Sequence, residues 1–174
     1  EDSKSEGLKG LFFSKKEIKT YQNDLQNLYQ NTIDKANFNA QVLNLNTYIS
    51  LKDFYREDFI VKGYFFNNKI VGFLSALKNK NHLDAHFIGL DYDLNKTHAI
   101  YPRILNDYVR LGIQLKVKQI NLGRTASEIK TTIGATPLEL SCYIKHKNKF
   151  INGLIRPFFK KIQIKSFKQH NPFK

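Results

Sequence analysis

Two neighbouring apolar segments joined by a two-residue polar turn place the strongest constraint on how this chain of 174 residues can fold. Apolar and polar residues alternate over residues 59–66, and residues 70–77 are almost continuously apolar. The first pattern is typical of a strand with one face in the core, and the second of a central strand covered on both faces. Asn67 and Asn68 between them tolerate the positive φ angles of a tight turn. The sequence therefore predicts an antiparallel hairpin within a sheet.

Two amphipathic helices are predicted before this hairpin. Apolar residues spaced by three and four positions share one face over residues 15–35, which indicates a single helix packed on the sheet. Asn46 or Thr47 starts a second helix that runs to residue 55. We expect residues 1–14, which precede these helices, to form a flexible segment.

After the hairpin, strands and helices continue to alternate. Residues 83–90 predict a strand, and residues 99–115 predict a long helix with Pro102 in its first turn. Residues 138–144 predict a last strand. This alternation indicates one α/β domain over residues 15–174.

Between the long helix and the last strand, residues 120–137 combine features of a strand, a turn and a helix start. The strand turns through Gly123, Thr125 or Ser127 can cap the short helix that follows, and Gly134 ends it. A helix start has unpaired N–H groups and a positive dipole end, and Arg124 adds a guanidinium, so the motif can bind an anion. The alternative is that both glycines are turn residues and Arg124 is a surface charge. The predicted substrate-binding residues of this motif are Arg124, Thr125 and Lys130.

The strand over residues 83–90 carries the candidate catalytic side chains. Alternation places Asp84 and His86 on one face together with Ile88 and Leu90. We expect His86 to act as a general base near neutral pH, with Asp84 orienting its imidazole. The alternative is a structural pair, either exposed at an edge or buried and mutually satisfied. Asp91 follows the strand and is expected to hold an amine acceptor, or only to cap the next turn.

The order of elements resembles the core of the GNAT acyltransferase fold. GLDYDLN at residues 89–95, LGRTASEIKTTIGA at residues 122–135 and the closing NPFK are similar to the GNAT-related family that groups with Fem-type (FemAB-like) peptidoglycan aminoacyltransferases. The resemblance covers residues 18–174 and implies an α/β fold with a GNAT-like mixed central sheet flanked by helices. It also implies transfer of an acyl or aminoacyl group to an amine by direct attack, with Tyr55 lining the acceptor site. Fem-type proteins resemble two such halves in tandem, and this chain, which begins at Glu1 and contains no Met, fits the second half.

The resemblance leaves the acyl donor open. Ordinary GNAT enzymes bind coenzyme A through a pyrophosphate loop, Arg/Gln-x-x-Gly-x-Gly/Ala, at the junction between strand and helix. Here the junction reads DYDLNKTHAIYPR, without a glycine after Gly89, so the backbone cannot approach a pyrophosphate in the usual way. The donors that remain under consideration are acyl-CoA, an acyl-carrier protein and aminoacyl-tRNA.

Charge suggests a further partner. The formal net charge is +13, and no acidic residue follows Glu139. Apolar residues interleave with basic ones over residues 145–174, which suits an acidic carrier protein, tRNA or an anionic membrane surface. The alternatives are a solvated basic face and apolar residues that close the core. A catalytically silent GNAT-like module that docks through this basic segment is therefore the second functional hypothesis.

The remaining composition excludes several classes of site and location. The only cysteine, Cys142, cannot form an internal disulfide, and no apolar stretch or leader suggests membrane insertion or secretion. We expect a cytoplasmic protein, peripheral at the membrane if the basic segment docks there. No Cys/His spacing indicates a metal site, and no nucleophile elbow or Walker loop occurs.

Overall fold

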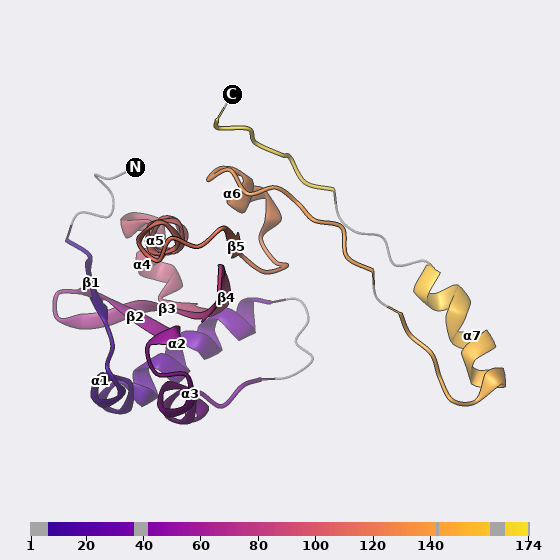
Figure 1. The fold of residues 1–174 in the computed structure, drawn as a ribbon, viewed down its shortest axis with the longest axis horizontal. Coiled ribbons are helices and arrows are strands. Elements are labelled where there is room, and N and C mark those ends of the chain that lie inside the picture. The colour runs from indigo at the N-terminus through magenta and orange to yellow at the C-terminus, as the bar shows by residue number, and fades with distance from the viewer. Residues whose placement is uncertain (1–6, 37–41, 142, 161–165, 174) are drawn as a thin grey trace. The chain divides into compact units, whose positions relative to one another are not determined.

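The computed structural model describes residues 7–36, 42–141, 143–160 and 166–173. The chain divides into two compact units, an N-terminal unit over Glu1–Gly123 and a C-terminal unit over Arg124–Lys174 (Figure 1). Each unit is described by itself.

A five-stranded mixed sheet forms the centre of the N-terminal unit. Its strands lie in the order β1-β2-β3-β4-β5, and all neighbours are antiparallel except β4 and β5, which are parallel. The strands are β1 (Lys9–Phe12), β2 (Phe59–Phe66), β3 (Lys69–Asn79), β4 (His82–Leu90) and β5 (Gln119–Asn121). The predicted hairpin is confirmed as β2 and β3, and Asn67 and Asn68 turn between them at φ angles of 47° and 62°.

The N-terminal boundary of the domain differs from the prediction. Residues 9–12 were expected to be flexible, but they form the edge strand β1 against β2, and the flanking Leu8 and Phe13 are buried. These two side chains anchor the segment, so the folded unit begins before residue 15.

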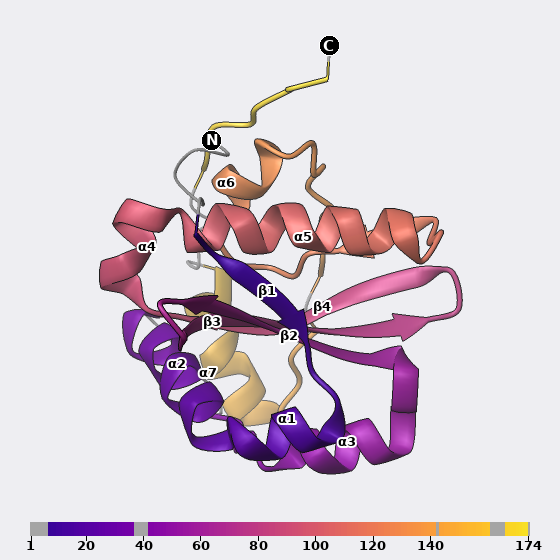
Figure 2. The ribbon, with the colours of Figure 1, turned by 90° about the vertical axis from the view of Figure 1, so that its left-hand side faces the viewer.

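Helices cover both faces of the sheet (Figure 2). One face packs against α1 (Lys15–Thr20), α2 (Gln22–Lys35) and α3 (Thr47–Tyr55), and a 3₁₀ turn over Arg56–Asp58 leads into β2. The other face packs against α4 (Tyr92–His98) and α5 (Ile100–Gln114). The single helix expected over residues 15–35 is interrupted at Tyr21, whose backbone leaves the helical region at φ −98° and ψ 15°.

A buried ion cluster links the sheet to α5. The carboxylate of Asp107 on α5 accepts hydrogen bonds from Lys62 and from the hydroxyl of Tyr64, both at 2.8 Å. Burial acts to raise the pKa of Asp107, but these hydrogen bonds and the charges of Lys62 and Arg103 outweigh it and lower the pKa. The ionised Asp107 therefore links α5 to β2 through an ion pair and a hydrogen bond.

The C-terminal unit contains α6 (Ser127–Thr131) and α7 (Lys149–Lys160). The strand expected over residues 138–144 is wrong. Its described residues are irregular, and no strand in the described part of the chain pairs with them. Leu138, Leu140 and Tyr143 are largely exposed. Cys142 lies outside the described residues. Among the described helices of the whole chain, none is long and apolar enough to cross a membrane.

Candidate active site

The edge of β4 is the most distinctive part of the N-terminal unit. β5 pairs with β4 only from His82 to Asp84 and ends at Asn121, whereas β4 continues to Leu90. Gly123, at φ +75°, turns the chain away, and its N–H donates to the side chain of Asn121 at 3.0 Å. The stretch of β4 after Asp84 therefore has no partner from β5, and no described strand pairs with this edge.

A β-bulge lies in this same stretch. Leu74 is opposite Ile88 and Ala76 is opposite Ala85, so that the single residue Ser75 faces two residues of β4, His86 and Phe87. The Oγ of Ser75 satisfies the irregular backbone, because it accepts from the N–H of Phe87 and donates to the carbonyl of Phe87, both at 3.0 Å. Ser75 is fully buried, so the bulge is fixed from inside the core.

The bulge changes which side chains share a face of the sheet. Ile88 and Leu90 were expected on the face of His86, but they pack in the cluster beneath α5. His86 and Phe87 instead contact aromatic residues on the opposite face, Tyr48 and Tyr29 respectively. The extra residue inverts the alternation, so every residue of β4 after the bulge lies on the face opposite to the one predicted.

His86 is held in an aromatic and hydroxyl environment. Its Nδ1 lies 3.3 Å from Ser75 Oγ, which also bonds the hydroxyl of Tyr48 at 2.8 Å. The rings of Tyr48, Phe59 and Phe87 have centroids 5.9, 6.2 and 4.3 Å from that of His86. Burial lowers the pKa of His86, so its imidazole is neutral at neutral pH and able to accept a proton.

The other predicted catalytic residues have structural partners. Asp84 accepts a hydrogen bond from the side chain of Asn121 at 3.2 Å, across β4 and β5. The orienting contact expected from Asp84 is made by Ser75. Asp91 caps α4, because its Oδ1 accepts from the backbone N–H groups of Asp93 and Leu94, both at 3.1 Å.

The predicted acceptor-lining residue lies at the end of α3. Tyr55 is half exposed and stacks edge-on against Phe54, with ring centroids 4.8 Å apart. The side chain of α3 that reaches His86 is Tyr48, which is fully buried. Its hydroxyl binds Ser75, and the sequence signal for this role was only an aromatic residue on the inner face of the helix.

The start of α5 does not provide a pyrophosphate loop. Phosphates bind helix starts through free backbone N–H groups. Here the N–H of Tyr101 donates to Asn95 Oδ1 at 2.7 Å, and Pro102 has no N–H. Ala99, in the left-handed region at φ 48°, joins α4 directly to α5. These residues do not fit the small-residue loop through which GNAT enzymes bind coenzyme A.

The predicted anion-binding residues belong to the C-terminal unit. Arg124 and Thr125 are exposed. The predicted caps are wrong, because α6 has Ala126 at its N-cap position and no side-chain cap. Lys130 is buried, and burial lowers its pKa to about 8. Gly134 adopts the predicted left-handed conformation after α6, at φ +85°.

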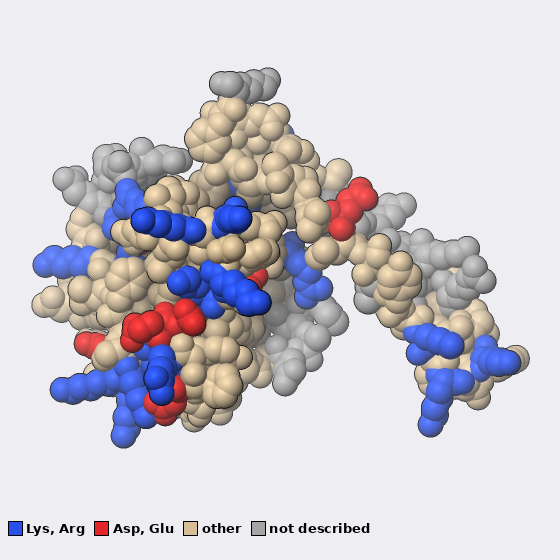
Figure 3. Space-filling view, in the orientation of Figure 1, with Lys and Arg blue, Asp and Glu red and all other residues tan. Residues whose placement is uncertain are grey.

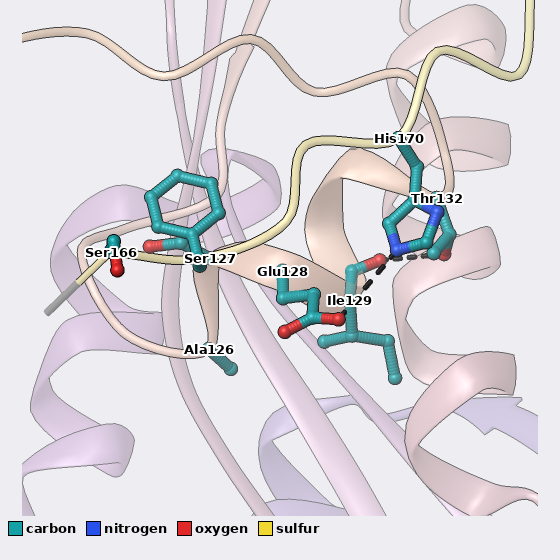
Figure 4. Close-up of a pocket in the computed structure, with 8 residues that line it drawn as sticks. Ala126, Ser127, Glu128, Ile129, Thr132, Ser166 and His170 are labelled. Carbon is teal, nitrogen blue, oxygen red and sulfur yellow. Dashed lines mark hydrogen bonds and ion pairs between the residues drawn. The ribbon is translucent and has the colours of Figure 1, made fainter.

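An open cavity of about 670 Å³ lies within the C-terminal unit (Figure 4). It is bordered by α6 and by the chain around His170, whose Nε2 lies 3.7 Å from Glu128 Oε1. The backbone N–H of His170 also donates to Thr131 Oγ1 at 3.0 Å. No sequence pattern indicates this cavity, since its two walls are more than thirty residues apart in the chain.

Comparisons with known proteins give the fold. No family model and no curated protein matches the chain. An aminoglycoside acetyltransferase from an uncultured soil metagenomic sample, solved with sisomicin, is 13% identical with a TM-score of 0.59 over 81% of this chain and 97% of that chain. A GNAT family acetyltransferase from Staphylococcus aureus is 16% identical with a TM-score of 0.56 over 80% and 98% of the two chains. Glucosamine-6-phosphate N-acetyltransferase from Arabidopsis thaliana is 9% identical with a TM-score of 0.57 over 82% and 100%. The fold of this chain is thus the GNAT acetyltransferase fold, as the sequence predicted.

Proposed function

We propose that this protein is an N-acyltransferase that moves an acyl group from an activated donor to an amine. The observation that carries the proposal is the edge of β4 after Asp84, with which no described strand pairs and which bears the half-buried imidazole of His86 at its bulge. The GNAT fold supports this assignment. The similar solved enzymes are named for aminoglycosides and glucosamine-6-phosphate, so amino sugars are the first acceptors to test.

The reaction needs no covalent enzyme intermediate. The acceptor nitrogen attacks the acyl carbonyl carbon, and the bond from that carbon to the donor's leaving atom breaks. Backbone N–H groups at the edge of β4 stabilise the developing oxyanion. His86 removes the proton that the attacking amine must lose and returns it to the leaving sulfur or oxygen, which departs as the free thiol or hydroxyl. Because Ser75 holds Nδ1, Nε2 is the ring nitrogen that takes the proton.

The other predicted residues enter the proposal in secondary roles. Asp91 is the alternative proton acceptor, although its Oδ1 already caps α4. Asp84 is proposed to support the catalytic strand, because its carboxylate accepts from Asn121 while Ser75 makes the contact with His86. Tyr55 keeps its proposed place in the acceptor site. Residues proposed to bind an anionic group of a substrate are Arg124, Thr125 and Lys130.

The donor is proposed as an acyl-CoA, the donor of GNAT acetyltransferases. Because the N–H of Tyr101 at the start of α5 is already bonded to Asn95, we expect the pyrophosphate of such a donor to bind weakly there. This same observation keeps acyl-carrier protein and aminoacyl-tRNA, the Fem-like donor, as alternatives. A panel of these three donor classes with amino sugars and aminoglycosides, followed by mass spectrometry of the acceptor, identifies the class. No product from any donor by the folded chain would favour the silent docking module.

Substitution of His86 tests the catalytic role. With the donor and acceptor pair found in the panel, His86→Ala is expected to lower turnover about 100-fold, the usual loss for a general base. The matched control is His82→Ala, since His82 lies on the same strand and is exposed. Equal turnover of His86→Ala and the parent across the titration range of the imidazole would transfer the role to Asp91.

A further inference from the structure

α7 presents an apolar face to solvent. Successive residues of a helix are about 100° apart, so Phe150, Ile151, Leu154 and Ile155 share one face, while Lys149 and Asn152 lie on the other. Phe150 is 78% exposed, Leu154 63% and Ile151 39%. Such a row of exposed large apolar side chains marks an interaction site rather than an ordinary surface.

The net charge is concentrated in the part of the sequence that contains this helix. Residues 124–174 contain eleven Lys and Arg against two acidic residues, whereas residues 1–123 contain 17 against 13. Lys145, Lys147 and Lys149 are exposed just before or at the start of α7, and no acidic residue follows Glu139. Figure 3 shows only basic charges among the described residues around α7. Charge complementarity therefore favours an anionic partner for this helix.

The length and composition of α7 identify the kind of partner. Twelve residues of helix span roughly 18 Å, too short for the roughly 30 Å core of a bilayer, so the helix can lie on a membrane but cannot cross it. A nucleic acid would pair with the lysines and stack on Phe150, but it would leave aliphatic side chains such as Leu154 in water. A lipid surface satisfies both faces at once, with acyl chains for the apolar face and anionic headgroups for the lysines.

We propose that α7 docks this protein on an anionic lipid surface, with its apolar face inserted at the headgroup boundary. The proposal is independent of acyl transfer and of His86. Phosphatidylcholine vesicles with and without phosphatidylserine provide the test, with co-sedimentation of the full chain as the measurement. The chain is expected to bind the vesicles that contain phosphatidylserine and to be released as salt rises.

Two pairs of variants separate the contributions. Lys145→Gln, Lys147→Gln and Lys149→Gln together are expected to weaken the partition by roughly 100-fold, since each lysine near an anionic surface contributes about fivefold. The matched control is Lys16→Gln, Lys19→Gln and Lys118→Gln, three exposed lysines of the N-terminal unit. It should retain nearly all of the parent's partition.

The apolar face is tested by Phe150→Ser with Leu154→Ser. These changes should weaken binding by about tenfold or more, because each removes apolar surface that the lipid would bury. The control is Phe54→Ser with Ile113→Ser, which removes two side chains of similar exposure, 79% and 71%, from the N-terminal unit. Unfolding curves should confirm that all variants fold.

Several outcomes overturn the proposal. The parent binding neither vesicle, or binding both equally, excludes recognition of anionic lipid. Retained binding by both α7 variants excludes this helix. In another outcome, the parent binds no vesicles and forms a dimer in sedimentation velocity. If Phe150→Ser with Leu154→Ser makes that dimer dissociate, the apolar face binds a second copy of the chain. Binding of tRNA or of an acidic carrier protein by a parent that does not bind vesicles assigns the lysines to that partner.

Discussion

Ser75 offers the sharpest test of how the bulge in β4 is held. Its hydroxyl contacts the Tyr48 hydroxyl, the N–H and carbonyl of Phe87, and Nδ1 of His86. Ser75→Ala removes this group while preserving the backbone, and it leaves at least the Tyr48 hydroxyl and the Phe87 N–H without these partners. A buried polar group that loses its partner costs about 1–3 kcal/mol. We therefore expect a loss of roughly 2–5 kcal/mol in the free energy of unfolding.

Urea unfolding followed by circular dichroism measures this loss. Tyr48→Phe is the companion variant, expected to cost only about 1 kcal/mol because Ser75 keeps its other partners. In the double variant, Ser75→Ala no longer strands the tyrosine hydroxyl, so the double loss should be smaller than the sum by about 1 kcal/mol or more. A loss below about 1 kcal/mol for Ser75→Ala, or strict additivity, would refute the idea that this serine fixes the bulge.

Three further predictions concern the surrounding fold. Asp107→Asn is expected to cost about 3 kcal/mol near neutral pH, because it leaves Lys62 without its buried counter-ion. Since folding lowers the pKa of Asp107, its contribution to the free energy of unfolding is complete above about pH 4 and is lost as pH falls through the folded pKa. The stabilities of parent and variant should therefore converge in urea titrations at acid pH. Gly89→Ala should destabilise the fold by about 2 kcal/mol or more, because a Cβ would lie 2.5 Å from the backbone of α2. The control is Gly153→Ala, which should not destabilise because the space around Gly153 is open, and thermal unfolding compares the two variants. Asp91→Ala should cost about 1 kcal/mol by removing the cap of α4, and a loss near zero in the same assay would mean that the cap is not needed.

Much of the fold is predictable because it depends on long periodic segments. The hairpin of β2 and β3, helix α3 and helix α5 follow directly from apolar spacing and turn residues. β1 was not predicted, since four residues are too few to show alternation, and only its contacts with β2 reveal it. The expected strand over residues 138–144 failed for the opposite reason: β-forming residues without a partner strand do not make a sheet.

The candidate site was less predictable. His86 was identified because it is an ionisable residue in a predicted strand, but its partner was misassigned to Asp84 because strict alternation hides a bulge. No glycine or proline of β4 marks the extra residue, so the sequence of this strand alone does not predict the bulge. Ser75 was the available signal. It is a lone hydroxyl in the apolar run over residues 70–77, and a buried hydroxyl must have partners.

Whether His86 serves chemistry or packing can be decided through stability. An imidazole half-buried among Tyr48, Phe59 and Phe87 gains little from that environment, and burial lowers its pKa. Because the unfolded chain binds the proton more readily, the parent should lose stability as pH falls below about 6.5 and through the folded pKa of His86. His86→Leu replaces the ring with an apolar side chain, so we expect the free energy of unfolding to be unchanged or higher at neutral pH. The loss of stability in acid should shrink, while turnover should fall about 100-fold, as for His86→Ala. Urea titrations of both proteins at several pH values provide the comparison. Destabilisation by more than about 2 kcal/mol at neutral pH would instead show that the histidine is part of the packed core, and the proton-acceptor role would lose its physical basis.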